Sequence, residues 1–280
     1  MHLEFFGATR EVTGSCYLLT VGDKRILVEC GLIQGSHTHE RHNRDDFPFQ
    51  PKDVDAVVLT HAHLDHSGRL PLLIKRGFRG PVYTHRATAD LCAIMLEDAG
   101  YLNEKDAQWE NRKRERKGLE PVEPLYSRDE AREASKRFES IEYGEAREIL
   151  PGARLTLRDA GHILGSAIAE LELSEGGATR KVVFSGDLGH KGAPILRDPE
   201  LVRQADLVVM ESTYGDRQHR GWQETWQEMG EVLSSARSEK GNVLIPAFTV
   251  GRTQELLYEF KRHYDDWGIG DWEVFLDSPM

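Results

Sequence analysis

The sequence predicts an α/β fold, and three observations carry that prediction. Short apolar segments suited to buried strands alternate with amphipathic segments suited to helices. After residue 210, a helical pattern at 253–264 lies between two strand-like segments, which gives a β-α-β order. A cluster of histidines directly follows one of the apolar segments. The 280 residues suffice for one large domain, or for one domain and part of another.

The individual elements follow from periodicity and from the breaks between segments. A hairpin-like break at residues 21–24, Val-Gly-Asp-Lys, separates the first two β-rich segments. The expected strands lie at residues 17–20, 25–29, 55–60, 81–84, 154–158, 168–173, 181–185, 207–210, 242–246 and 273–277. The expected helices lie at residues 71–75, 88–96, 224–238 and 253–264.

Residues 97–137 are charged and helical in pattern, with a break between Gly118 and Pro124. We expect an insertion that lies over the core. It contains one basic run, Asn111-Arg112-Lys113-Arg114-Glu115-Arg116-Lys117. A solvated helix end is the simpler interpretation of this run, and contact with RNA is the alternative.

Composition excludes several classes of protein. The chain is 39% hydrophobic and 30% charged, which is typical of a soluble globular protein. No apolar run approaches the roughly 20 residues of a membrane span, and the first residues do not resemble a secretory signal. Its 3 cysteines suggest reduced thiols and a cytoplasmic location. The net charge of −11 does not favour nucleic-acid binding, although an enzyme needs only a local positive groove.

The histidine cluster predicts a site for two metal ions. Residues 61–66 read His-Ala-His-Leu-Asp-His. At a strand end, residues two apart point the same way, so His61 and His63 can bind one ion. The chain then turns toward the helix that starts at Pro71, which places Asp65 and His66 to bind a second ion. Imidazole and carboxylate ligands suit zinc, with manganese or iron as alternatives.

Two coordination shells need further ligands from distant segments. His162 lies in a Gly-His-Ile-Leu-Gly segment after a predicted strand, and Asp187 lies between glycines at another strand end. Glycine allows the tight backbone that brings a ligand to an ion. Asp187 is the natural bridge, because its carboxylate has one oxygen for each ion.

A pair of ions activates a shared water molecule and neutralises charge on a phosphoryl group, but the leaving oxygen needs a separate acid. Glu211 is a candidate for that role, because it stands where the apolar segment 207–210 passes into a loop. A surface glutamate without a function is the alternative.

On these motifs the chain resembles the metallo-β-lactamase superfamily, and specifically its β-CASP ribonucleases. That family includes the endonuclease subunit of the mRNA 3′-end cleavage and polyadenylation machinery and its prokaryotic relatives. The histidine cluster alone indicates only the superfamily. Residues 211–215 (Glu-Ser-Thr-Tyr-Gly) and 246–256, with Pro-Ala-Phe followed by Gly251 and Arg252, indicate the nuclease branch. The resemblance covers essentially the whole chain and includes residues 6–16, 30–35, 61–71, 159–166, 185–189, 211–215 and 246–256.

The resemblance implies an αββα sandwich at residues 1–207 and the start of an inserted β-CASP domain at 208–280. The chain ends at a predicted strand without a closing element, so we expect it to be C-terminally truncated. By the resemblance, a zinc-dependent ribonuclease would cleave RNA phosphodiester bonds. The resemblance implies single-stranded RNA as the partner and no association with a membrane. It leaves a homodimer open.

The family pattern also assigns roles to individual residues. It implies that one zinc ion is bound by His61, His63, His162 and Asp187, and the second by Asp65, His66 and Asp187. Asp65 and Glu211 are the expected catalytic residues, and Gly251 and Arg252 are weak candidates for RNA contact.

The chain departs from the family pattern in two ways. Glu29 stands where the family has an aspartate that supports the metal ligands, and its extra methylene group is expected to loosen that support. The last two site histidines of the family would lie beyond residue 280. Two alternatives therefore stay open: a hydrolase of thioesters or lactones on the same fold, and a catalytically incomplete RNA-binding subunit.

Overall fold

The computed structural model describes residues 1–278, which form two compact units. The first unit comprises residues 1–160, 165–187 and 200–211. The second comprises residues 161–164, 188–199 and the chain from Ser212 onward. None of the helices in residues 1–278 combines the length and the apolar composition that a membrane span requires.

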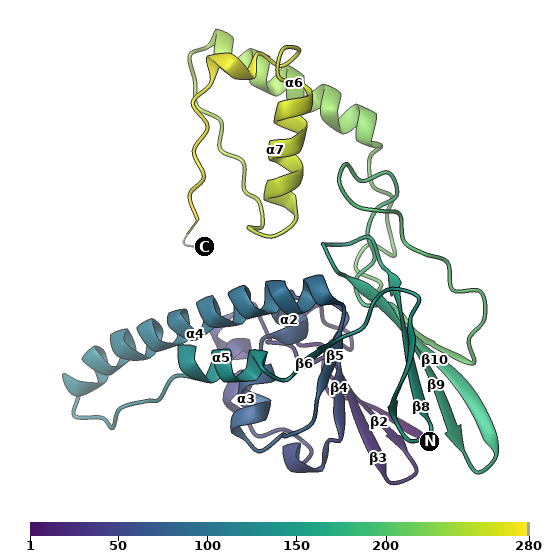
Figure 1. Cartoon of the computed structure of the whole chain (residues 1–280). Coiled ribbons are helices and arrows are strands. Elements are labelled where there is room, and N and C mark those ends of the chain that lie inside the picture. The colour runs from purple at the N-terminus through teal and green to yellow at the C-terminus, as the bar shows by residue number, and fades with distance from the viewer. Residues whose placement is uncertain (279–280) are drawn as a thin grey trace. The chain divides into compact units, whose positions relative to one another are not determined.

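The first unit contains two sheets (Figure 1). The first sheet has the order β1-β2-β3-β4-β5-β6, antiparallel from β1 to β3 and parallel from β3 to β6. Its strands are β1 (His2–Phe5), β2 (Tyr17–Val21), β3 (Lys24–Val28), β4 (Ala56–Val58), β5 (Val82–Thr84) and β6 (Phe138–Ser140). The second sheet has the order β11-β10-β9-β8-β7, antiparallel except for the parallel pair β10 and β11. Its strands are β7 (Ala146–Leu150), β8 (Ala153–Asp159), β9 (Ala167–Glu175), β10 (Ala178–Phe184) and β11 (Leu207–Val209).

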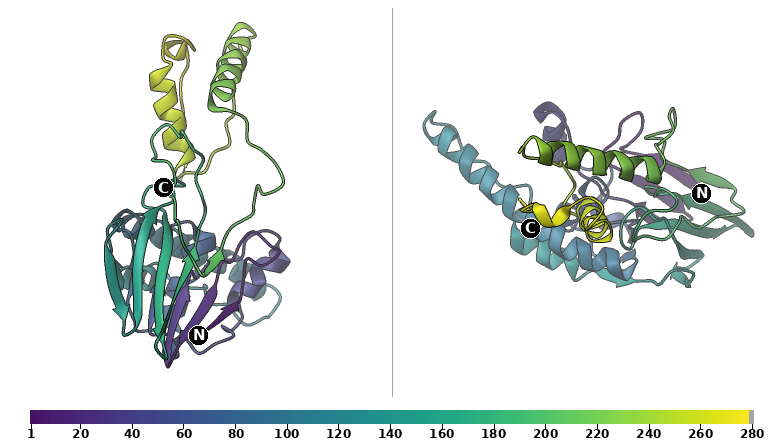
Figure 2. Two further views of the ribbon diagram at one scale, coloured as in Figure 1. Left: turned by 90° about the vertical axis from the view of Figure 1, so that its right-hand side faces the viewer. Right: turned by 90° about the horizontal axis from the view of Figure 1, so that it is seen from above.

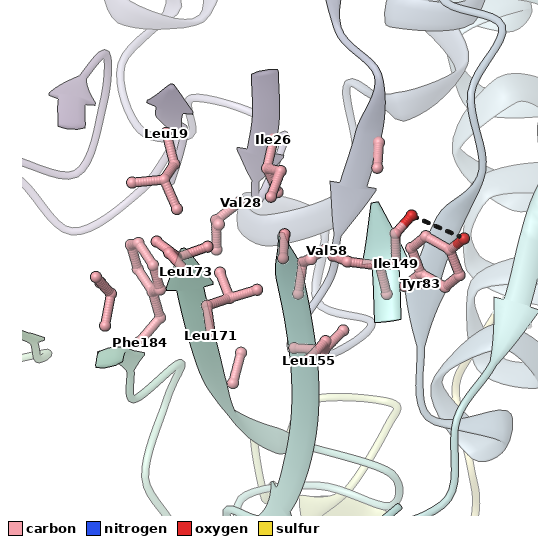
Figure 3. Close-up of a cluster of buried hydrophobic side chains, with 14 of the residues drawn as sticks. Leu19, Ile26, Val28, Val58, Tyr83, Ile149, Leu155, Leu171, Leu173 and Phe184 are labelled. Atoms are coloured by element: carbon pink, nitrogen blue, oxygen red, sulfur yellow. Dashed lines mark hydrogen bonds between the residues drawn. The ribbon is translucent and has the colours of Figure 1, made fainter. Parts of the chain in front are cut away.

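The core of this unit lies between the two sheets, where the inward side chains of both face one another (Figure 3). Val28 and Val58 of the first sheet and Leu155 and Leu171 of the second are all fully buried. β4 is apolar throughout (AVV) because both of its faces are covered, whereas β8 (ARLTLRD) alternates between apolar and polar residues because only its inner face is covered by the partner sheet. The two-sheet core therefore confirms the predicted sandwich.

A layer of helices covers the first sheet on the side away from the second (Figures 1 and 2). The helices of the unit are α1 (His37–Glu40), α2 (Leu64–Ser67), α3 (Leu70–Lys75), α4 (Arg86–Glu115) and α5 (Arg128–Ser135), with 3₁₀ turns at Arg41–Arg44 and Pro51–Asp53. α4 is one continuous helix of 30 residues, longer than the predicted helix at 88–96. It extends through the charged insertion because no proline interrupts it before Gly118.

The second unit contains α6 (Trp222–Ser238), α7 (Arg252–Arg262) and a 3₁₀ turn at Ile269–Asp271. Leu233, Trp267 and Ile269 form its small core. The strands predicted at 242–246 and 273–277 are wrong, because the described residues there form no strand. A strand needs hydrogen bonds to a neighbour, and Leu244 is instead 93% exposed. The predicted domain boundary at residue 207 stays a prediction.

Replacing Ile26 by Val should lower the free energy of unfolding by about 0.5–1.5 kcal/mol, because Ile26 is fully buried between the sheets. Denaturant unfolding measures the change. The matched control is Ile94→Val, since Ile94 is 60% exposed and its loss of one methyl group should change stability by less than about 0.5 kcal/mol. Equal effects of the two substitutions would contradict the position of the core.

Candidate metal centre

The histidine cluster lies in the loop between the C-terminal end of β4 and the start of α2. His61 is completely buried, His66 is 6% exposed, and His63 and Asp65 are half-buried. Backbone hydrogen bonds tie this loop to the segment after β3: the Cys30 N–H donates to the His66 carbonyl at 2.8 Å, and the Leu32 N–H donates to the Leu64 carbonyl at 2.8 Å. The two segments therefore form one rigid unit that positions the histidines.

Gly31 lies at the closest approach of these two segments. A Cβ atom at this position would lie 1.6 Å from the backbone oxygen of Asp65. Ser15 also approaches here, and its N–H donates to the same Asp65 oxygen at 2.9 Å. The absence of a side chain at Gly31 is thus what allows the loop with Asp65 to pack against the end of β3.

His61 and His63 present ring nitrogens to one another, as expected for residues two apart at a strand end. His61 Nε2 lies 3.2 Å from His63 Nδ1. The other nitrogen of His61, Nδ1, is 3.0 Å from the hydroxyl of Thr60, which holds the ring in one orientation. Asp187 Oδ2 lies 3.7 Å from His61 Nε2. These three side chains have their potential ligand atoms within 4.8 Å of one another.

His66 presents its Nε2 atom to the other side of the same carboxylate. Its Nε2 lies 3.2 Å from Asp187 Oδ1 and 3.7 Å from Asp65 Oδ2. Its Nδ1 lies 2.7 Å from Glu29 Oε2, which fixes the orientation of the ring. Asp187 therefore has one oxygen near His61 and the other near His66. Its role as a bridge between two ions stays a prediction.

Asp187 reaches this position because β10 ends in a tight turn. Gly186 has a positive φ of 54°, and a Cβ atom there would lie 2.7 Å from the Thr60 hydroxyl. The turn brings Asp187 from the second sheet to the loop that follows β4 in the first sheet. Glu211 follows β11, the strand that pairs with β10. Its N–H donates to the Ser185 hydroxyl at 3.1 Å.

Charge and burial set the protonation of the histidines. Burial lowers the pKa of His63 below its usual value, which favours the neutral ring. Burial also opposes protonation of His66, but its hydrogen bonds to Asp187 and Glu29 outweigh that effect and hold its pKa well above the usual value. A cation at this position would take the place of the proton.

Glu29 contacts both Thr60 and His66 from the buried side of the site. Its side chain is 2% exposed, and burial raises the pKa of its carboxyl group. Oε1 accepts a hydrogen bond from the Thr60 N–H at 2.8 Å, and Oε2 contacts His66. The extra methylene group does not prevent either contact. Glu29 itself has a positive φ of 63°, which is uncommon for a residue with a side chain.

Replacing Glu29 by Gln should weaken metal binding about 10–100-fold, the usual effect of losing a group that orients a ligand. A Gln amide has one oxygen and one NH₂ group, so it cannot accept hydrogen bonds from both Thr60 and His66. Competition with a chelator measures the affinity, and Glu139→Gln on the exposed strand β6 is the matched control. An unchanged affinity in Glu29→Gln would show that the carboxylate does not orient His66.

The other predicted site residues belong to the second unit and stay predictions. His162 lies in the segment 161–164, and Gly251 and Arg252 lie at the start of α7. Gly251 has a positive φ of 93° as the residue before the helix, and Arg252 forms an ion pair with Glu255 at 2.8 Å.

Sequence reasoning missed the support that Thr60 and Gly31 give to the site. A hydroxyl residue between an apolar run and a histidine was the available signal for Thr60. The three cysteines are buried and free, in agreement with the prediction of reduced thiols.

The residues present fit a divalent metal ion. A tetrahedral zinc ion with Zn–N bonds of about 2.1 Å holds two nitrogens about 3.4 Å apart. The separation of 3.2 Å between His61 Nε2 and His63 Nδ1 is close to that value. Thr60 and Glu29 occupy the outer nitrogens of His61 and His66, as supporting groups do around bound metals. Glu29 lies near both rings, and its two oxygens contact the Thr60 N–H and the His66 ring.

Comparison with known proteins agrees with this geometry. Residues 9–247 match the metallo-β-lactamase superfamily, and the chain belongs to that superfamily. It is similar to ribonuclease TTHA0252 of Thermus thermophilus, with 44% identity over the whole chain and 59% of that protein. It is also similar to transcription termination factor FttA of Methanocaldococcus jannaschii, with 35% identity over the whole chain and 42% of that protein. The chain thus spans about half the length of the curated relatives it matches.

Proposed function

We propose that this chain provides the metal-binding part of a zinc-dependent ribonuclease of the β-CASP type. The observation that carries the proposal is the position of Asp187, with one carboxylate oxygen toward His61 and the other toward His66. The names of its relatives, a ribonuclease and a transcription termination factor, support RNA as the substrate class. The acidic net charge does not oppose it, because bound cations would supply positive charge at the site.

In this proposal the ligands divide into two sets that share Asp187. His61, His63 and Asp187 would hold one ion, with His162 as the fourth ligand. Asp65 and His66, again with Asp187, would hold the second. Zinc suits this set of imidazoles and carboxylates best, and manganese is the alternative. When bound, the two ions supply an activated water molecule and neutralise charge on the phosphate.

The chain's own residues would position the ions and move a proton. Thr60 and Glu29 hold His61 and His66 in fixed orientations, so that their Nε2 atoms point toward Asp187. Glu211 would donate a proton to the leaving ribose oxygen, because it follows β11 next to the turn that carries Asp187. Single-stranded RNA is the proposed substrate, and the cytoplasm is the proposed location. A homodimer is left open.

RNA cleavage tests this function. We expect zinc or manganese to support cleavage of single-stranded RNA by the 280-residue chain or by the longest product that its gene encodes. Replacing Asp65 or His66 by Ala should lower the rate at least about 100-fold, since each removes a ligand rather than a supporting group. Asp23→Ala on the exposed hairpin is the control. Absence of cleavage by both forms, or cleavage that is unchanged in the two variants, would refute the proposal.

A further inference from the structure

The outward side of the second half of α4 combines exposed aromatic rings with basic side chains. We call it the α4 face. Its members follow one another at helical spacings of three and four residues, so they share one side of the helix. They are Tyr101, Leu102, Lys105, Trp109, Arg112, Lys113 and Arg116. Tyr101 is 42% exposed and Trp109 is 58% exposed, which is unusual for large rings in a unit with a well-packed core.

Each exposed ring lies beside a cation. The Lys113 ammonium nitrogen is 3.0 Å from the centroid of the Trp109 ring, and the Lys105 nitrogen is 5.3 Å from the Tyr101 centroid. Such cation–π contacts hold the rings in place over the helix. One face of Trp109 is covered by Lys113, and its exposure leaves the rest of the ring open to a ligand.

The basic side chains of the α4 face, Arg112, Lys113 and Arg116 among them, form no ion pair with any carboxylate of residues 1–278. Nearby Arg128 and Arg132 of α5, by contrast, both pair with Glu97, at 2.5 and 2.7 Å.

The positive charge is concentrated toward the C-terminal end of the helix. Residues 109–117 contain 5 basic and 2 acidic side chains in a chain of net charge −11. Asp98 and Asp106 lie on or beside the earlier part of the same side of the helix. The C-terminal half of the α4 face is therefore the part suited to an anion.

The end of α4 is held firmly by the chain that returns from it. The Asn111 side chain accepts a hydrogen bond from the Val122 N–H at 2.7 Å and donates one to the Val122 carbonyl at 2.9 Å. Arg114 donates to the Glu120 carbonyl at 2.6 Å. The α4 face is thus a preformed surface, and a ligand would not need to order it first.

We propose that the α4 face binds single-stranded RNA, with bases stacked on Trp109 and Tyr101 and phosphates bound by Arg112 and Arg116. Aromatic rings interleaved with basic side chains are the features that bind single strands without regard to sequence. Contact with a second copy of the same face would bring like charges together, which disfavours that occupant. The identity of the ligand rests on the proposed ribonuclease function, whereas the surface does not.

Binding of a labelled oligouridylate in the presence of a chelator tests the proposal without cleavage. The double variant Arg112→Glu with Arg116→Glu should bind at least about tenfold more weakly, and the slope of log affinity against log salt should fall by about 1.4, or 0.7 for each lost phosphate contact. Trp109→Ala should weaken binding about fivefold to a hundredfold without changing that slope. Lys52→Glu with Arg154→Glu is the control, because it makes the same charge change at two exposed positions elsewhere in the first unit.

The outcomes separate this surface from the ribonuclease site. Weaker binding in the α4 variants alone, with the metal content of the purified proteins unchanged before the chelator is added, supports the proposal whether or not RNA is cleaved. Equal binding by the wild type and the α4 variants overturns it, even if cleavage is observed. Equal losses in the α4 and control variants also overturn it, because binding would then follow total charge. A mass that rises with concentration and falls in the α4 variants would assign the surface to a protein contact and overturn it too.

Discussion

Replacing Asp187 by Asn is expected to abolish binding of both metal ions. The two carboxylate oxygens lie near different histidines, so a neutral amide removes a charged ligand from each ion. The loss of affinity should exceed about 100-fold, since even groups that only orient a ligand account for about 10–100-fold. Thermal unfolding measures this, because a ligand that binds the folded chain raises its melting temperature. Zinc should raise the melting temperature of the wild type and not that of Asp187→Asn.

Asp23→Asn is the control for this substitution, since Asp23 is 88% exposed on a hairpin. It removes the same charge and should leave the effect of zinc unchanged. If Asp187→Asn lost only one of two bound ions, the carboxylate would be a ligand of a single ion. The bridging geometry would then be wrong.

Replacing Gly31 by Ala should disrupt the metal site without changing any ligand. The new methyl carbon would lie 1.6 Å from the Asp65 backbone oxygen, so the loop with Asp65 and His66 must move. Overpacking of a well-packed interior destabilises by about 1–3 kcal/mol, and a clash between two backbone segments belongs at or above the upper end of that range. We expect lower stability in denaturant unfolding together with weaker zinc binding.

Gly241→Ala is the matched control, because a Cβ atom there would meet its nearest neighbour at an ordinary 3.6 Å. It should change stability by less than about 1 kcal/mol and leave zinc binding intact. Wild-type zinc affinity in Gly31→Ala would mean that the metal ligands do not depend on the contact between these two segments.

Candidate metal ligands could be named from the sequence because their spacing expresses local geometry. His61 and His63 share a direction at a strand end whatever the fold around them, and the glycines beside Asp187 indicate a tight turn. The supporting contacts are different in kind. Gly31 meets Asp65, and Glu29 meets His66, only after two separate segments have packed together. No local pattern in either segment reports that contact.

The errors in the predicted fold also arise where long-range contacts, rather than local patterns, decide the structure. An apolar β-rich segment at 242–246 forms a strand only if another strand pairs with it, and pairing is a long-range property. The length of α4 was underestimated because its second half is charged on most sides, so its pattern lacks the apolar stripe that marks a buried helix. Gly100 in its interior is explained only by the fold, since a Cβ atom there would lie 2.9 Å from the backbone of Arg128.

The metal content of the purified chain tests most directly whether Asp187 lies between two ion sites. Elemental analysis after equilibration with zinc and removal of excess metal should find about two ions per wild-type chain and close to none in Asp187→Asn. At most one ion per wild-type chain, or an unchanged content in Asp187→Asn, would contradict a two-ion site bridged by this carboxylate.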